Sequence, residues 1–223
     1  MIPRSLLRGE FIFNLKFMKK PLLLIGFLTF SFFILFSYFV DKDIFLQFDF
    51  DTTVRAQDKI PRRFDEAFSV LSDIGKFEPM LLLLIILLIF RKKLWGIIAF
   101  SLFGILHVIE LFGKFFVDHP PPPEFLLRTK HLIEFPQFHV RSEFSYPSGH
   151  AARAAFLTLI VGLLVGRSKR FSYTQKIFII SILAIYDVFM IVSRVYLGEH
   201  WASDVIGGAV LGFSLGILSA LLL

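Results

Sequence analysis

The sequence predicts an all-α polytopic membrane protein, a bundle of six transmembrane helices with both termini in the cytoplasm. Two features of its composition lead to this fold class: 56% of the 223 residues are hydrophobic, and 30 are phenylalanine. Soluble domains seldom have such a composition. The third observation is that long apolar runs alternate with short charged segments, which is the pattern of chains that cross a bilayer several times.

The first predicted span covers residues 21–40, twenty residues without a charge, enough to cross a hydrocarbon layer of roughly 30 Å. A cleaved signal peptide would end in small residues, whereas this run ends at Asp41, so we expect an uncleaved helix. The second run, 79–90, is short for a crossing, and we expect its helix to start upstream, within 73–78. Four further spans are predicted at 94–117, 148–166, 177–195 and 203–223.

The distribution of basic residues orients this bundle. Segments 1–20, 91–93 and 167–176 hold 12 Lys and Arg in 33 residues, whereas the opposite segments hold 9 in 74. The positive-inside rule therefore predicts that the first set is cytoplasmic. Residues 1–20 then form a cytoplasmic segment, and residues 21–223 form a single membrane domain.

Two classes of function are disfavoured by composition. The chain has no cysteine, which excludes disulfides and thiolate chemistry. Its net charge of +6 is a feature of many nucleic-acid-binding proteins, but the basic residues cluster beside apolar spans, so we expect no nucleic-acid partner.

A histidine and an aspartate four residues apart, His200 and Asp204, begin the last span. At this spacing a carboxylate can bond one ring nitrogen, fix the tautomer and leave the other nitrogen as a nucleophile. A purely structural pair at a helix start is the alternative.

The segment Pro-Ser-Gly-His at 147–150 precedes another apolar run, and its proline and serine indicate a helix start with Ser148 as the N-cap. Free N–H groups at a helix start form an anion site suited to phosphate, and Gly149 permits close approach. His150 can donate a proton to a leaving oxygen. Turn and capping chemistry alone also explains the first three residues.

Two cations lie at the same predicted membrane face. Arg194 ends the fifth span, where its guanidinium can bind two phosphate oxygens or simply reach the headgroups. Lys114 lies in the last turns of the third span, where it can bind phosphate or pair with Glu110.

These motifs resemble those of the type 2 phosphatidic acid phosphatase superfamily, the membrane-bound lipid phosphate phosphatases. The second family motif, Pro-Ser-Gly-His, is intact at 147–150, and the third, Ser-Arg-x5-His-x3-Asp, is intact at 193–204. The resemblance is strongest over 65–223. It implies that His200 attacks phosphorus, that Asp204 orients it and that His150 protonates the leaving group. It also implies that Lys114, Ser148, Gly149 and Arg194 hold the phosphate, with no metal or other cofactor.

The first family motif, Lys-x6-Arg-Pro, departs from the pattern, because Pro121 stands where the arginine is expected after Lys114. We expect His119 to replace part of that cation as a substrate-binding residue. Other candidates are basic residues that fold back from the loop or lie on the helix after His150: Arg128, Arg141 and Arg153. For Arg153 we favour an ion pair with Asp187 or Glu110 instead.

The sequence thus predicts an integral membrane phosphatase that hydrolyses a lipid phosphate or diphosphate at the outer leaflet through a phosphohistidine. Phosphatidic acid, phosphatidylglycerophosphate and undecaprenyl diphosphate are all open as substrates, and a bacterial inner membrane is the expected location. A phosphotransferase that uses a lipid diphosphate and a non-catalytic lipid-binding relative are the alternatives.

Overall fold

The computed structural model describes residues 15–89, 93–130 and 144–220, and the described residues form α-helices, two short 3₁₀ turns and no strand. The α-helices are α2 (Leu15–Asp41), α3 (Leu46–Lys59), α4 (Asp65–Ile74), α5 (Phe77–Ile89), α6 (Lys93–Phe116), α7 (Gly149–Arg167), α8 (Tyr173–Tyr196) and α9 (Ala202–Ala220). The 3₁₀ turns are η1 (Arg62–Phe64) and η2 (Glu124–Leu126). The all-helical prediction is confirmed for these residues.

Five of these helices are long and apolar enough to cross a membrane, namely α2, α6, α7, α8 and α9. The second predicted span corresponds to α5, which starts upstream of residue 79 as expected, at Phe77. Asp73 lies in α4, and the chain leaves that helix at Gly75 before α5 begins at Phe77. With 13 residues, α5 is about 20 Å long, shorter than a hydrocarbon layer of roughly 30 Å. A sixth crossing therefore stays a prediction.

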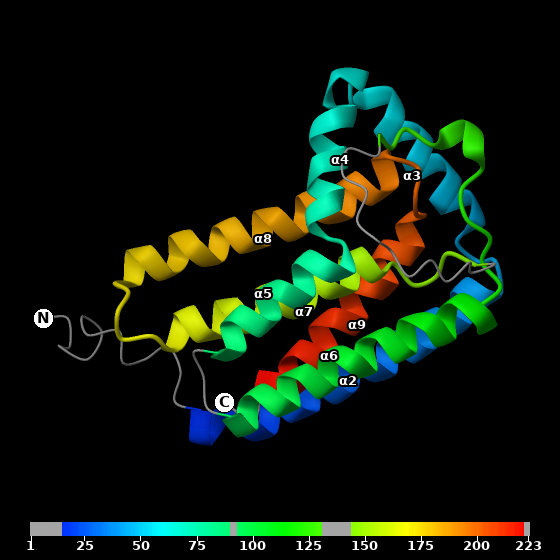
Figure 1. Ribbon diagram of the computed structural model, residues 1–223. Helices are drawn as coiled ribbons and strands as arrows, with labels where there is room; N and C mark the ends of the chain where they lie inside the picture. Colours follow the sequence, from blue (N-terminus) through cyan, green and yellow to red (C-terminus); the bar gives the residue numbers. More distant parts are fainter. Residues whose placement is uncertain (1–14, 90–92, 131–143, 221–223) are drawn as a thin grey trace, which may run out of the picture.

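Helix α9 lies at the centre of the bundle, with its most extensive contacts to α7 and α2 (Figure 1). A stripe of glycines at every fourth position of α9, Gly208, Gly212 and Gly216, explains how α7 comes so close. A Cβ on Gly212 would lie 2.0 Å from the carbonyl oxygen of Ala152, and one on Gly208 would lie 2.2 Å from that of Ser148. The stripe therefore packs helices inside the bundle, as small residues do in membrane proteins.

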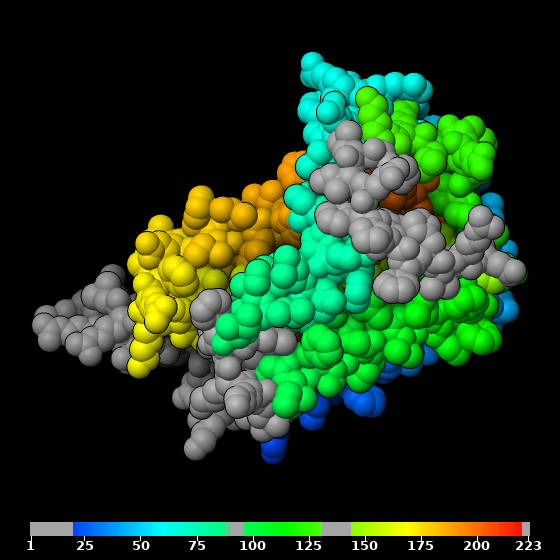
Figure 2. Space-filling view, in the orientation of Figure 1, coloured from blue at the N-terminus to red at the C-terminus, as the bar shows by residue number. Residues whose placement is uncertain are grey.

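The ends of the helices are sorted in the way that the charge pattern predicts. The start of α2, the turn between α7 and α8 and the end of α9 lie at one end of the bundle, while α3 and α4 lie at the other (Figure 1). Figure 2 shows α4 and the neighbouring green segment around η2 standing over this second end. The basic turn between α7 and α8 is thus separated from the motifs at 147–150 and 193–204 by the length of the bundle (Figure 1).

Helix α3 has an inverted pattern of burial. Its buried side chains are polar and recur every four residues, at Asp49, Thr53 and Gln57. Leu46, Phe48 and Phe50 on the same helix are exposed. Polar contacts to the protein and an apolar face outward are typical of a helix that lies in a membrane interface.

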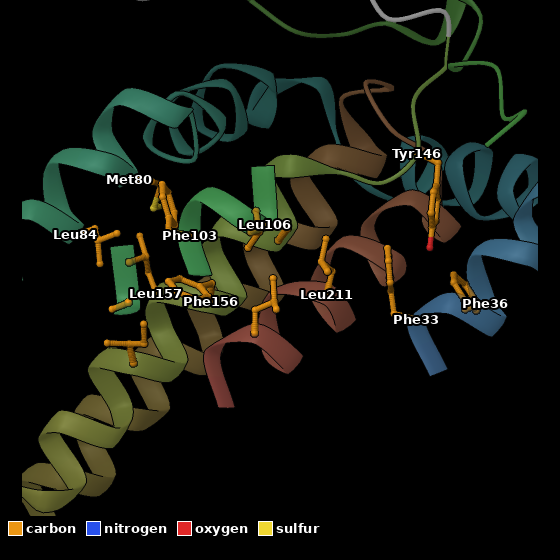
Figure 3. Packing of buried hydrophobic residues seen from close by; sticks show 14 of the residues in the cluster. Phe33, Phe36, Met80, Leu84, Phe103, Leu106, Tyr146, Phe156, Leu157 and Leu211 are labelled. Carbon is orange, nitrogen blue, oxygen red and sulfur yellow. The ribbon is translucent and has the colours of Figure 1, made fainter. Parts of the chain in front are cut away.

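A cluster of buried hydrophobic residues connects α2, α5, α6, α7 and α9 (Figure 3). Tyr146 belongs to this cluster: its ring stacks on Phe33 with centroids 6.2 Å apart, and its hydroxyl lies 2.9 Å from the Ser37 hydroxyl. Because Tyr146 is held in the core and directly precedes Pro147, the core fixes the segment that starts α7. The peptide bond between Tyr146 and Pro147 is cis.

Candidate functional site

The His200–Asp204 pair is buried at the start of α9. Nδ1 of His200 lies 3.3 Å from Oδ2 of Asp204, and the same oxygen accepts the Trp201 N–H at 3.0 Å. His200 precedes the helix rather than lying in it, and Asp204 reaches back from the first turn as a capping carboxylate does. The predicted i, i+4 contact is present, across a helix start.

A tight turn between α8 and α9 brings His200 to this place. The N–H groups of Glu199 and His200 both donate to the carbonyl oxygen of Arg194, at 3.1 and 3.2 Å. Gly198 has a φ of 69°, the left-handed conformation that glycine adopts at little cost. The turn therefore holds Arg194 and His200 close together.

Burial lowers the pKa of the His200 imidazole well below its usual value, and the Arg194 guanidinium acts in the same direction. The ring is therefore neutral at neutral pH. With Nδ1 directed at a carboxylate, it carries its proton there and its free lone pair on Nε2.

The segment 147–150 forms the start of α7 as predicted, with Ser148 in the N-cap position. The Ser148 hydroxyl makes no capping bond, and neither it nor Nε2 of His150 has a hydrogen-bond partner among the described residues, although both atoms are buried. Ser148 N–H donates to the backbone oxygen of Asp204 at 3.0 Å, which ties the starts of α7 and α9 together. Two unused polar atoms thus lie at the N-terminus of a helix.

Each cation near this helix start is paired with a carboxylate. Lys114 lies 3.1 Å from Glu110 Oε1, and Arg153 donates to Glu110 Oε2 at 2.9 Å. The predicted Arg153–Glu110 pair is therefore confirmed. Arg194 donates to Glu199 and to the Ser72 hydroxyl.

The Glu110 carboxylate lies directly against the first residue of α7. A Cβ on Gly149 would come within 1.9 Å of Glu110 Oε1, so a larger residue would have to displace this carboxylate. An anionic group thus occupies the place where free N–H groups and the helix dipole favour negative charge.

Electrostatic interactions join the motifs into one site. His150 interacts electrostatically with His200 and with three cations, Arg194, Arg153 and Lys114. His200 interacts with the same three cations and with Glu110. The structure therefore brings together Lys114, Ser148, Gly149, His150, Arg194, His200 and Asp204.

The remaining candidates, His119, Arg128 and Arg141, were expected to supply the missing cation. Nε2 of His119 lies 3.6 Å from Asp204 Oδ1 and 3.6 Å from Asp49 Oδ2, so this ring faces two carboxylates. Arg128 donates to the backbone oxygen of Gln57 and lies over the Tyr196 ring. Arg141 is outside the described residues.

Sequence reasoning missed three polar contacts of the site, which involve Asp49, Ser72 and Glu199. Asp49 and Ser72 come from α3 and α4, in a stretch whose role the sequence does not reveal. The spacing of Asp49, Thr53 and Gln57 was the available signal, a polar stripe at helical period. Among the described residues no group of three or more His, Cys, Asp and Glu side chains is arranged to hold a metal ion.

The model of the PAP2 superfamily matches residues 92–223 of this sequence. The chain belongs to the PAP2 superfamily. The match contains Lys114 and both intact motifs, so the resemblance drawn from those motifs is confirmed. Together with the five apolar helices, family membership makes the chain an integral membrane protein.

Phosphatidylglycerophosphatase B of Bacillus subtilis (strain 168) is a curated relative, 27% identical over 158 residues, which are 69% of this chain and 70% of that protein. The fold is similar to the crystal structure of the transmembrane PAP2-type phosphatidylglycerolphosphate phosphatase from Bacillus subtilis. The TM-score is 0.71 at 24% identity, over 87% of this chain and 94% of that one. It is also similar to Aquifex aeolicus LpxE, with a TM-score of 0.57 at 24% identity over 78% and 94% of the two chains.

Proposed function

We propose that this PAP2 protein is a membrane phosphatase that hydrolyses a lipid phosphate or diphosphate through a phosphohistidine. The observation that carries the proposal is the buried contact between His200 Nδ1 and Asp204 Oδ2, at 3.3 Å. It leaves Nε2 as the attacking atom, and the lowered pKa of the ring keeps that atom unprotonated. As the N–P bond forms, the Asp204 carboxylate stabilises the positive charge that develops on the ring.

The phosphate is held by Lys114, Arg194 and the start of α7 at Ser148 and Gly149. In the structure these cations are paired with Glu110 and Glu199, and Glu110 lies against the helix start. A phosphate that enters replaces the carboxylates on the same cations, because its oxygens offer the same charge-assisted bonds. The cation that the family has at position 121 is absent, and Arg153, bonded to Glu110, lies near enough to add positive charge.

His150 acts as the acid and then as the base. In the first step it gives a proton to the oxygen that leaves as the P–O bond breaks. In the second step it takes a proton from the water that attacks the phosphohistidine, which releases phosphate and restores His200. Its buried Nε2 has no partner among the described residues, as expected of an atom whose partner is the substrate.

A lipid substrate fits the position of the site at the end of apolar helices. Phosphatidylglycerophosphate leads our list, because the curated relative and the solved structure from Bacillus subtilis both carry that substrate in their names. Phosphatidic acid and undecaprenyl diphosphate follow. Residues 21–223 form a single domain of six spans in a bacterial inner membrane, with both termini cytoplasmic and the site at the outer leaflet, in keeping with the basic segments 1–20, 91–93 and 167–176.

The test is phosphate release from phosphatidylglycerophosphate in detergent micelles by the purified full chain, with EDTA present. We expect turnover by the wild type, loss in His200→Ala, and an acid-labile, alkali-stable phosphoprotein on rapid quench. The exposed Asp58→Asn on α3 serves as the control. Equal turnover by His200→Ala would refute the mechanism, and phosphate appearing on an added alcohol instead of in water would make the protein a transferase.

A further inference from the structure

His119 contacts the oxygen of Asp204 that His200 does not use. His200 lies against Oδ2, whereas His119 Nε2 lies 3.6 Å from Oδ1. Both His119 and Asp204 are almost fully buried. The catalytic carboxylate therefore has a histidine at each of its two oxygens.

A second carboxylate, Asp49 of α3, completes this cluster. Asp49 accepts the Ser203 N–H and the Ser203 hydroxyl, each at 2.7 Å, and its Oδ2 lies 3.6 Å from His119 Nε2. Burial raises the pKa of Asp49, while the two bonds from Ser203 and the nearby His119 act against that shift. Asp49 thereby satisfies a free N–H group in the first turn of α9.

The hydrogen bonds determine which nitrogen of His119 carries a proton. The single proton of the Ser203 hydroxyl is donated to Asp49, so Ser203 Oγ can only accept from His119 Nε2, which is 3.1 Å away. Nε2 therefore bears a proton and points it between Ser203 and two carboxylates. Nδ1 of the same ring is buried and has no hydrogen-bond partner among the described residues, so the ring is held through Nε2.

The backbone around His119 is fixed as firmly as the ring. Its carbonyl oxygen accepts both the N–H and the hydroxyl of Ser145, at 2.9 and 3.1 Å. The carbonyl oxygen of the next residue, Pro120, accepts the Trp201 indole N–H at 2.8 Å. The first residues of the proline run are thus tied to the segment that carries His200.

We propose that His119 and Asp49 are positioning residues for the catalytic carboxylate: the His119 ring, held by Ser203 and Asp49, lies against Oδ1 of Asp204 and keeps Oδ2 directed at His200. This rests on the proposed phosphohistidine chemistry. No proton passes along the cluster, and its contribution is geometry. It assigns His119 a different role from the phosphate contact that the altered first motif suggested.

The charges that face Asp204 come from several elements. His200 and His119 lie at its two oxygens, Asp49 of α3 and Lys114 of α6 add one charge of each sign, and Tyr146 before α7 adds a neutral hydroxyl. Removal of the His119 ring takes away the neighbour of Oδ1, and the Asp204 carboxylate can then turn away from His200.

The test is the variant His119→Gln, whose amide can still donate to Ser203, assayed across pH with phosphatidylglycerophosphate micelles. We expect kcat to fall about tenfold, the scale seen when a group that orients a functional side chain is lost. We expect an unchanged KM at every pH, because the variant leaves Lys114, Arg194 and the start of α7 in place. Asp58→Asn on the same helix as Asp49 is the matched control and keeps the wild-type values.

Two outcomes overturn the proposal. One is a raised KM at unchanged kcat, which indicates a phosphate contact, and the other is wild-type kinetics. If His119→Gln does not fold, Asp49→Asn replaces it, since it keeps an oxygen for the Ser203 N–H. It must then lower kcat at constant KM. An inactive wild type would instead refute the proposed function.

Discussion

The two histidines at Asp204 have the same partner and opposite surroundings. His200 faces one carboxylate and, on its other side, the Arg194 and Lys114 cations. His119 lies between the carboxylates of Asp49 and Asp204. The same side chain therefore faces cations in one place and carboxylates in the other, and the neutral His200 ring has the lone pair that can attack phosphorus.

Removal of the shared partner breaks the comparison most severely. In Asp204→Asn neither histidine keeps its carboxylate, and the tautomer of His200 is no longer fixed. We expect kcat to fall about 10⁴-fold, the scale known for the loss of an orienting aspartate. Steady-state assays on protein with a wild-type melting temperature measure this, and a loss of less than a factor of about ten would show that Asp204 does not orient His200.

Both histidines depend on the packing of α9 against α7. In Gly212→Ala the new Cβ meets the Ala152 carbonyl oxygen, and such overpacking costs about 1–3 kcal/mol. We expect a lower melting temperature in detergent. Gly104→Ala on α6 is the matched control, because nothing lies within 4 Å of its new Cβ. Equal melting temperatures for the two variants would mean that α7 and α9 are not held at this distance.

A double-mutant cycle sharpens the role of the second histidine. If His119 and Asp49 act as one unit, Asp49→Asn with His119→Gln lowers kcat by about the same tenfold as His119→Gln alone. Independent contributions would multiply to about a hundredfold. The kcat values of the four proteins at one pH decide between the two outcomes.

The pH dependence of the wild type tests the neutral state of His200, with the smallest expected effect. Attack requires the unprotonated ring, and a lowered pKa means that this form persists below the ordinary histidine value of about 6.5. We therefore expect kcat/KM to remain level as pH falls through about 6.5 and to decline only further into acid. A decline centred at or above that pH would contradict the buried environment of His200.

The parts of the site that the sequence predicts are local. The contact of His200 with Asp204 follows from a four-residue spacing, and the start of α7 follows from Pro147 and Ser148. Family motifs predict that these segments meet Lys114 and Arg194. The glycine stripe also follows from the sequence, because the helical period places Gly208, Gly212 and Gly216 on one face of α9.

The parts that the sequence does not predict depend on contacts between distant segments. Asp49 meets Ser203 over more than 150 positions, and nothing near either residue signals the partner. The missing arginine at position 121 suggested a substitute cation in His119, but the bonds from Ser145 and Trp201 direct that ring toward Asp204 and Asp49. The start of α5 at Phe77 lies within the predicted 73–78, but the separate helix α4 that ends at Ile74 was not predicted.

The inverted burial pattern of α3 places a segment that contacts lipid next to the candidate catalytic site. Its buried face meets the bundle through Asp49, Thr53 and Gln57, while Leu46, Phe48 and Phe50 face outward and are stable only in an apolar medium. Under the proposed role of His119, a change in the surrounding lipid that shifts α3 would move Asp49, and through His119 it would reach Asp204. In this enzyme class, a bilayer can adjust turnover without touching the substrate.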